Sequence, residues 1–256
     1  MPNFTANLSL LFTEDTLIDR FKAAKQAGFD AVEMQFPYGL SPIDIKNKLD
    51  QYDLKLVLFN VDAADLLQRG EGLACIPGKR DQFKRAIAQA ANYAELLKPE
   101  AINVLPGRCQ DKKHLELYLE TFKENLCFAV EVFAPLGIKT VFEAVNTIDM
   151  PGFIIHSGVQ MLGVLGQLNL PSLFMQYDIY HLQMMGENPE AFIAEHADKI
   201  AHIQFADCPG RGQPGTGRIN FDRVFSAIDD SGYLGWVGAE YKPVGTTTDS
   251  LAWLKK

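Results

Sequence analysis

The chain alternates between short apolar runs and longer segments in which apolar residues recur every three or four positions. Short runs rich in β-branched and aromatic residues are typical of buried strands, and most of these runs are followed by a helical pattern. Alternation of strands and helices predicts an α/β fold with a parallel sheet, and eight repeats favour closure into a (β/α)8 or TIM barrel. The eight runs are residues 4–11, 30–36, 55–61, 101–105, 139–145, 173–178, 200–206 and 236–241.

The helical patterns carry recognisable end signals. Residues 16–28 have apolar positions at helical spacing and end at Gly28, a typical C-terminal capping residue. Residues 80–97 and 114–137 predict two long amphipathic helices. Asn220 is expected to cap the N-terminus of a helix late in the chain. The open-sheet alternative would lead us to expect a glycine-rich phosphate loop after an early strand, and no such motif is present there.

Length and composition agree with one barrel. The 256 residues are close to the roughly 250 of a typical (β/α)8 barrel, so we expect a single domain over residues 1–256. The chain is 47% hydrophobic and 22% charged, as in soluble globular proteins. No apolar stretch is long enough for a membrane span, and no secretory signal is present, which predicts a cytoplasmic protein without a membrane partner.

Charge and cysteine content narrow the function classes. A formal net charge of −8 disfavours nucleic-acid binding, since nucleic-acid proteins usually present a basic surface to the phosphates. Small anionic substrates remain possible, because they respond to local charge. The four cysteines are scattered singly, which favours reduced thiols over a zinc or disulfide framework: Cys75, Cys109, Cys127 and Cys208. A homo-oligomer is left open.

Four oxygen-bearing side chains stand late in four consecutive apolar runs: Glu143, Asp178, Gln204 and Glu240. The carboxyl ends of the strands are where the active sites of this fold lie, so the four side chains are expected to converge there. A single glutamate at a strand end is commonly a solvated rim residue or a partner for a lysine. Four polar side chains at the same late position in consecutive runs favour a functional site.

Buried carboxylates lose their hydration, and this loss is costly unless a cation or a substrate compensates the charge. Four oxygen donors without sulfur favour a hard divalent ion. We therefore expect one Mg²⁺ or Mn²⁺, with Zn²⁺ or Co²⁺ as possible substitutes. Two long loops, residues 62–79 and 209–220, are expected to cover this end of the barrel.

Several motifs make the chain resemble the hydroxypyruvate isomerase family of xylose-isomerase-like barrels, which includes the 2-oxo-tetronate isomerases. The resemblance runs nearly from end to end. It is carried by FTANLSLLFTE near the start, GFDAVEMQFPY (28–38), GLACIPGKR (72–80), VFEAVN (141–146), QYDIYHLQ (176–183), HIQFAD (202–207) and GWVGAEYKP (235–243).

The resemblance implies that Glu143 and Glu240 act as acid and base and also as metal ligands, with Asp178 and Gln204 completing the metal sphere. Such an isomerase moves a carbonyl group between adjacent carbons of a small 2-oxo acid, through a cis-enediolate. Hydroxypyruvate to tartronate semialdehyde is one such reaction, and a 2-oxo-tetronate would undergo the same shift. Two carboxylates on opposite sides of the substrate suit this chemistry, since one can remove a proton and the other can deliver one.

Other residues are candidates for substrate binding. His181 resembles the substrate-facing histidine of the family. Lys242 is the first candidate for the partner of a substrate carboxylate, with Arg80 and Arg218 behind it. His202 is expected to pack below the site. Polar contacts to substrate and ordinary strand-end capping are both open for Asn7, Glu33 and Asn60.

Three rival functions remain at this point. A ketose 3-epimerase would use the same metal and the same two glutamates to invert one carbon. An endonuclease of abasic DNA would require further histidine and aspartate ligands for several zinc ions, and the acidic balance opposes it. A non-catalytic barrel that binds a sugar acid or a partner protein is a third possibility, because a fold does not dictate a function.

Overall fold

Eight parallel strands close into a barrel in the computed structural model, which describes residues 1–255. Each strand pairs with its neighbours in sequence order, and β1 closes the ring by pairing with β8. The predicted (β/α)8 barrel is confirmed. The strands are β1 (Asn3–Asn7), β2 (Ala31–Met34), β3 (Lys55–Asn60), β4 (Ala101–Asn103), β5 (Lys139–Glu143), β6 (Leu173–Asp178), β7 (Ile200–Phe205) and β8 (Trp236–Ala239).

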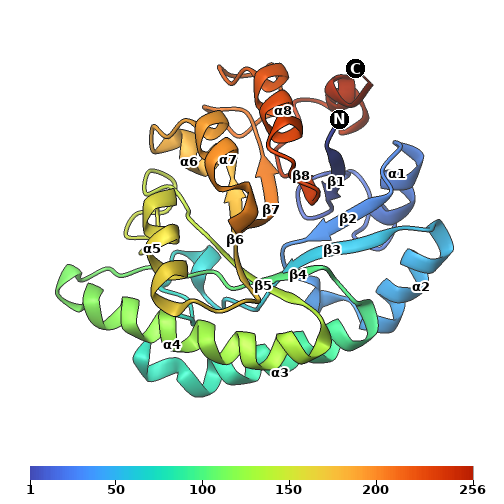
Figure 1. Cartoon of the computed structure of the whole chain (residues 1–256). Coiled ribbons are helices and arrows are strands. Elements are labelled where there is room, and N and C mark those ends of the chain that lie inside the picture. Colours follow the sequence, from blue (N-terminus) through green and yellow to red (C-terminus); the bar gives the residue numbers. More distant parts are fainter. Residues whose placement is uncertain (256) are drawn as a thin grey trace.

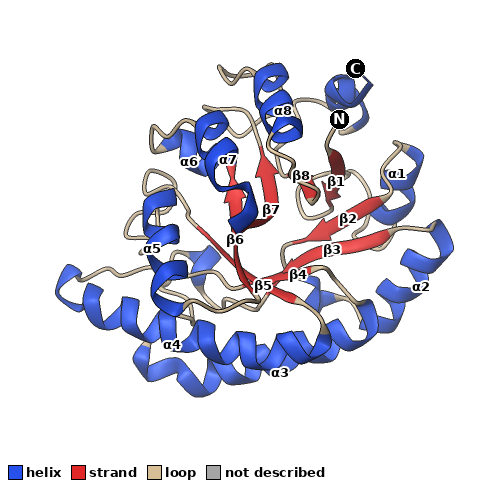
Figure 2. Ribbon diagram, in the orientation of Figure 1, coloured by secondary structure: helices blue, strands red, loops and turns tan. Residues whose placement is uncertain are grey.

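The helices lie outside the strands and surround the barrel (Figures 1 and 2). None of the helices within residues 1–255 is long and apolar enough to cross a membrane. The α-helices are α1 (Arg20–Gln26), α2 (Pro42–Tyr52), α3 (Arg80–Leu97), α4 (Leu115–Phe133), α5 (Gly158–Leu168), α6 (Ile179–Met184), α7 (Pro189–His196) and α8 (Phe221–Asp230), and a 3-10 segment, η7 (Thr248–Lys255), follows β8.

Local side chains set several helix boundaries. Asn220 caps α8 as predicted, because its side chain accepts the backbone N–H of Arg223 at 3.1 Å. The long helix predicted over residues 114–137 ends as α4 at Phe133 and continues as a 3-10 turn that contains Pro135. Gly137 follows with φ +75°, a left-handed conformation that glycine adopts without strain.

One predicted strand is shorter than expected. The apolar run 4–11 forms strand only as far as Asn7, whose carbonyl accepts the N–H groups of Leu10 and Leu11 in a turn. Leu8 and Leu11 are nonetheless fully buried. Their hydrophobicity reflects packing of a loop onto the core, which a run of apolar residues alone does not distinguish from a strand.

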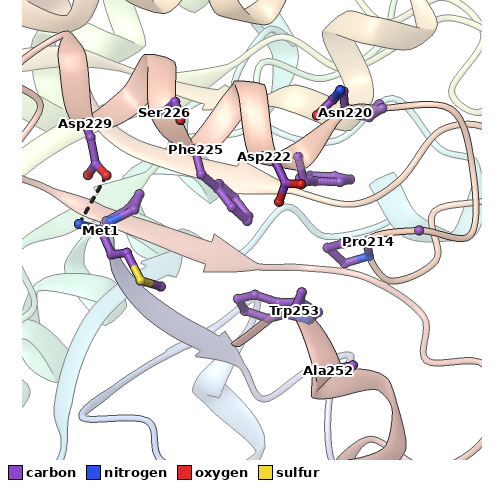
Figure 3. Close-up of a pocket in the computed structure, with 13 residues that line it drawn as sticks. Met1, Pro214, Asn220, Asp222, Phe225, Ser226, Asp229, Ala252 and Trp253 are labelled. Atoms are coloured by element: carbon purple, nitrogen blue, oxygen red, sulfur yellow. Dashed lines mark ion pairs between the residues drawn. The ribbon is translucent and has the colours of Figure 1, made fainter. Parts of the chain in front are cut away.

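Aromatic side chains pack where the last repeat meets the first. Phe205 of β7 lies 5.0 Å from Trp253 and 5.4 Å from Phe225, measured between ring centroids, and Phe4 of β1 contacts the same group. A cavity of about 540 Å³ lies beside this cluster, between α8 and η7 (Figure 3). Met1 lines it, and its ammonium group pairs with Asp229 at 3.1 Å. The cluster helps to hold the C-terminal segment against β1 and β7.

Candidate active site

The four predicted site residues lie at the carboxyl ends of neighbouring strands. Glu143 and Asp178 are the last residues of β5 and β6, Gln204 lies one residue before the end of β7, and Glu240 directly follows β8. All four are buried, with 1–6% of each residue exposed. Glu143 and Glu240 line a cavity of about 480 Å³. The structure thus brings the four side chains to one end of the barrel.

Amide side chains orient the two glutamates. Glu143 accepts hydrogen bonds from Asn103 Nδ2 at 3.0 Å and Gln176 Nε2 at 2.9 Å. Glu240 accepts hydrogen bonds from Asn7 Nδ2 at 3.1 Å and Gln35 Nε2 at 2.9 Å. Because each carboxylate accepts bonds from two fixed donors, its direction is set before any substrate arrives.

A second buried carboxylate network, centred on Glu33, supports the site. Glu33 bonds to His202 Nε2 at 2.7 Å, to Gln204 Nε2 at 2.7 Å and to Asn7 Nδ2 at 3.0 Å. His202, which was expected to pack below the site, is buried within this network. Gly238 of β8 makes room for the network, because a Cβ atom there would lie 2.3 Å from Glu33 Oε2.

Arg211 is the cation nearest these acidic groups, and it was not among the residues predicted from the sequence. Its Nη2 atom forms an ion pair with Glu240 Oε2 and lies 3.6 Å from Asp178 Oδ2. Its guanidinium also lies over the ring of Tyr180, 5.3 Å from the centroid. Arg211 therefore compensates part of the buried negative charge.

The loop between β7 and α8 carries Arg211 and is built around the buried carboxylate of Asp207. That carboxylate accepts four backbone N–H groups at 2.8–3.1 Å, those of Cys208, Gly215, Gly217 and Ile219. The sequence marked residues 209–220 as an active-site loop and Arg218 as a candidate cation. Arg218 is exposed, whereas Arg211 reaches the glutamates.

The predicted substrate-binding residues separate into two groups. His181 and Lys242 both line the cavity: His181 is 4% exposed, and Lys242 is exposed. Arg80 does not line it. Arg80 begins α3, where its half-exposed guanidinium pairs with Glu124. The structure therefore leaves Arg80 outside the group of residues that it brings together.

Part of the cavity lining is apolar. Leu66 and Leu67 come from the loop after β3, and Met150 and Phe153 come from the loop after β5. Leu67 is 56% exposed, so apolar surface is available beside the charged groups. A bound molecule would meet carboxylates, a guanidinium and hydrocarbon groups in one cavity.

Burial and mutual repulsion alter the pKa values of the acidic groups. Burial, together with the charges of Glu240 and Asp178, raises the pKa of Glu143 to about 8 against the opposing effects of Asn103 and Arg211. Burial also raises the pKa of Glu240 to about 7, although Arg211 acts in the opposite direction. Burial raises the pKa of Asp178 as well. The cluster is therefore short of positive charge.

The donor set fits a hard dication by its chemistry. Carboxylate and amide oxygens are the ligands that Mg²⁺ and Mn²⁺ prefer, and the repulsion among the carboxylates is what a dication would relieve. Within the described part of the chain, no three His, Cys, Asp or Glu side chains stand in an arrangement ready to hold a metal ion. In the structure, Glu240 is instead paired with the Arg211 guanidinium.

The fold and this site define a class of protein. The sequence matches the model of the xylose isomerase-like TIM barrel family over residues 21–256. The chain therefore belongs to this family, and the resemblance inferred from its motifs is confirmed.

Named relatives identify the branch of the family. A hydroxypyruvate isomerase from Escherichia coli K12 is 40% identical over 254 residues, which cover 99% of this chain and 98% of the relative. A 2-oxo-tetronate isomerase from Pectobacterium atrosepticum is 36% identical over 253 residues, covering 99% and 97%. The chain is an enzyme of the isomerase type that these relatives represent.

A solved structure agrees closely in backbone. The crystal structure of a protein from Brucella melitensis described as "AP endonuclease, family 2" superposes with a TM-score of 0.95 at 35% identity, covering 100% of this chain and 98% of that one. Proteins with this barrel are thus described as isomerases in two cases and as an endonuclease in a third. The chemistry of the site has to distinguish between these two activities.

The raised carboxyl pKa values predict how stability changes with pH in metal-free protein. Folded Glu143 keeps its proton up to about pH 8, whereas the unfolded chain loses that proton near 4.5. Between these values the folded state binds more protons, so the free energy of unfolding should fall as pH rises from 5 to 8. Glu143→Gln should flatten this slope by up to about 1 kcal/mol per pH unit.

Urea unfolding followed by circular dichroism at several pH values measures this slope. Glu95→Gln, at an exposed position on α3, is the matched control and should leave the slope unchanged. A Glu143→Gln protein with the wild-type slope would mean that Glu143 is ionised throughout the range.

Proposed function

We propose that this enzyme is a metal-dependent isomerase that interconverts hydroxypyruvate and tartronate semialdehyde, or that performs the same carbonyl shift on a 2-oxo-tetronate, through a cis-enediolate. The observation that carries the proposal is the pair Glu143 and Glu240, two oriented carboxyl groups in one cavity with pKa values raised to about 8 and about 7. General acids and bases work best when their pKa lies near the operating pH.

The two glutamates divide the proton transfers between them. One carboxylate takes the proton from the hydroxyl-bearing carbon, and the other carboxyl group gives a proton to the former carbonyl carbon. The hydroxyl proton passes to the former carbonyl oxygen, so that the carbonyl and the hydroxyl group exchange places. The hydrogen bonds from Asn103 and Gln176 hold Glu143, and those from Asn7 and Gln35 hold Glu240, so neither group has to reorient during the reaction.

A divalent ion, Mg²⁺ or Mn²⁺, is part of this proposal. Glu143, Asp178, Gln204 and Glu240 are the residues that would hold it, since their buried oxygens are the donors that such ions prefer. When bound, the ion supplies Lewis-acid stabilisation of the negative charge that develops on the substrate oxygens. The ion would favour the charged forms of the three carboxyl groups, whose pKa values are raised by burial first and by neighbouring carboxylates second.

Arg211 is the proposed partner of the substrate carboxylate. It is a guanidinium held over Tyr180 at the cavity wall, and its planar donors match a carboxylate. Lys242 lines the same cavity from an exposed position, and its backbone N–H donates to the Arg211 carbonyl at 2.7 Å. This arrangement favours Arg211 for the inner contact and Lys242 for the rim.

The alternative functions require different properties of the site. A ketose 3-epimerase would use the same two glutamates, and its product distinguishes it. DNA binding is the function suggested by the description of the Brucella melitensis protein, and a net charge of −8 with acidic groups in the cavity opposes contact with phosphates. The cytoplasmic location and a possible homo-oligomer remain predictions.

An assay in deuterated water tests the reaction and the metal together. Hydroxypyruvate and the 2-oxo-tetronates are each incubated with enzyme after chelation, and then with added Mg²⁺ or Mn²⁺. We expect activity to fall at least tenfold on chelation and to return with the ion, with the carbonyl moved by one carbon in the product. Deuterium uptake without carbonyl migration would instead indicate an epimerase, and full activity in chelator would remove the metal from the proposal.

Replacing one proton-transfer group should abolish turnover without unfolding the chain. Glu240→Gln keeps the shape but removes the group that exchanges a proton, so we expect kcat to fall by about 10²–10⁴-fold. Glu187→Gln is the matched control, because Glu187 is a partly buried glutamate that accepts the Gly158 N–H at 2.8 Å outside this cavity. Substantial turnover by a folded Glu240→Gln protein would remove Glu240 from its role.

The two cations at the cavity can be distinguished by their effect on KM. Arg211→Met removes the guanidinium but retains much of the side-chain volume, and we expect KM for a 2-oxo acid to rise about 10- to 100-fold because a charge-assisted hydrogen bond is lost. Lys242→Met should raise KM by a smaller factor. The reverse order would assign the carboxylate to Lys242, as the sequence first suggested.

A further inference from the structure

Asn146, three residues after β5, is completely buried, and the orientation of its side-chain amide is fixed by the backbone. Its Oδ1 atom accepts the backbone N–H of Ile148 at 3.1 Å and that of Asp149 at 2.8 Å. A backbone N–H can only donate, so this end of the amide has to be the oxygen. The usual ambiguity between the two ends of an asparagine side chain is therefore resolved by geometry.

The NH₂ end of Asn146 consequently points at its other neighbours. It lies 2.7 Å from Nδ1 of His181 and 2.9 Å from Oδ2 of Asp149. The backbone N–H of Asn146 also faces His181 Nδ1, at 3.5 Å. Since both neighbours of Nδ1 are donors, Nδ1 has to accept and carries no proton. His181 is therefore a neutral imidazole with its proton on Nε2.

We propose that Asn146 is a positioning residue that fixes this tautomer of His181, so that Nε2–H is a hydrogen-bond donor to the substrate. The inference rests on the proposed function for the identity of the substrate oxygen. His181 lines the cavity, and its Nε2 atom lies 3.6 Å from Asp178 Oδ2, among the groups that would surround a reacting molecule. A neutral donor there stabilises negative charge on the oxygen without adding another titrating acid.

The opposite tautomer of His181 would not provide a donor at Nε2. With the proton on Nδ1, that nitrogen would face two other donors, and the lone pair of Nε2 would face the Asp178 carboxylate and any substrate oxygen. Both contacts would be repulsive. Asn146 thus acts on the cavity through His181, much as an oriented partner selects the working tautomer of other catalytic histidines.

The same segment also supports Arg211. Asp149, whose Oδ2 atom accepts from Asn146, also accepts from the Tyr180 hydroxyl at 2.7 Å. The Tyr180 ring in turn lies against the Arg211 guanidinium. Asn146 therefore has one contact chain to His181 and another to Arg211, and an experiment on Asn146 has to separate them.

The tautomer can be observed directly in protein without metal or substrate. The chain contains five histidines, so long-range ¹H–¹⁵N spectra of histidine-labelled protein are sparse, and the signals lost in His181→Gln assign His181. We expect the wild-type spectrum to show His181 protonated on Nε2. A wild-type His181 protonated on Nδ1 would overturn the proposal, whatever the enzyme's substrate.

An exchange of two residues reverses the donor at Nδ1 with no change of net charge. In Asn146→Asp combined with Asp149→Asn, residue 146 still offers an oxygen to the two backbone N–H groups but presents a second oxygen to His181. We expect the proton to move to Nδ1 and kcat to fall about 10²-fold, the order of loss when one preorganised donor to a developing charge is removed. Asn146→Ala is the second variant, for which we expect a mixture of tautomers and a smaller loss.

A double-mutant cycle separates positioning of His181 from other roles. In a His181→Gln background the exchange should change kcat less than twofold, because the tautomer no longer exists. Persistence of the full loss would show that Asn146 acts by another route, such as Tyr180 and Arg211, and would overturn the proposal. Asn125→Ala, a buried asparagine on α4 that donates to the Ala74 carbonyl at 2.8 Å, should lower the melting temperature and leave the His181 spectrum unchanged.

Failure of this inference and failure of the proposed function give different results. An enzyme inactive on hydroxypyruvate and the 2-oxo-tetronates would refute the proposed function, while the spectra would still decide the tautomer. Normal isomerase activity in the exchanged variant, with the proton shown on Nδ1, would refute the positioning role alone.

Discussion

The site depends on the cost of bringing several like charges into a buried space. Glu143, Asp178 and Glu240 come from three different strands and meet where little water can reach them. Burial raises the pKa of each carboxyl group, and neighbouring carboxylates add a smaller contribution. Arg211 offsets part of this cost by pairing with Glu240. The amides around the carboxylates and the network around Glu33 hold the groups in place despite their repulsion.

The burial and mutual repulsion of these carboxyl groups suit the proposed chemistry. A carboxyl group whose pKa lies near neutrality can both accept and return a proton. A site short of positive charge favours the binding of a cation, and Arg211 is the group that would pair with an anionic substrate. Stability is given up for this purpose, as is common at functional sites.

Much of the arrangement was predictable because it follows from local patterns. Alternation along a strand and the late position of Glu143, Asp178, Gln204 and Glu240 were enough to place them at one end of a barrel. Arg211 was not predictable in the same way, because its position depends on how Asp207 folds a loop. Nor could the run 4–11 reveal that Leu8 and Leu11 are buried in a turn, since hydrophobicity reports burial rather than conformation. The contact between Asn146 and His181 joins two segments whose proximity only the tertiary structure shows.

The way in which the β7–α8 loop is assembled has a consequence for how such enzymes diversify. Because one carboxylate, that of Asp207, accepts four backbone N–H groups, the loop holds its conformation from within. The N–H groups of Lys242 and Val244 then join the loop to the segment after β8, through the Arg211 carbonyl and the Gln213 side chain. Under the proposed function, the partner of the substrate carboxylate and the proton-transfer groups therefore belong to separate parts of the chain, so that substitutions within the loop would alter the first and leave the second on the strands unchanged.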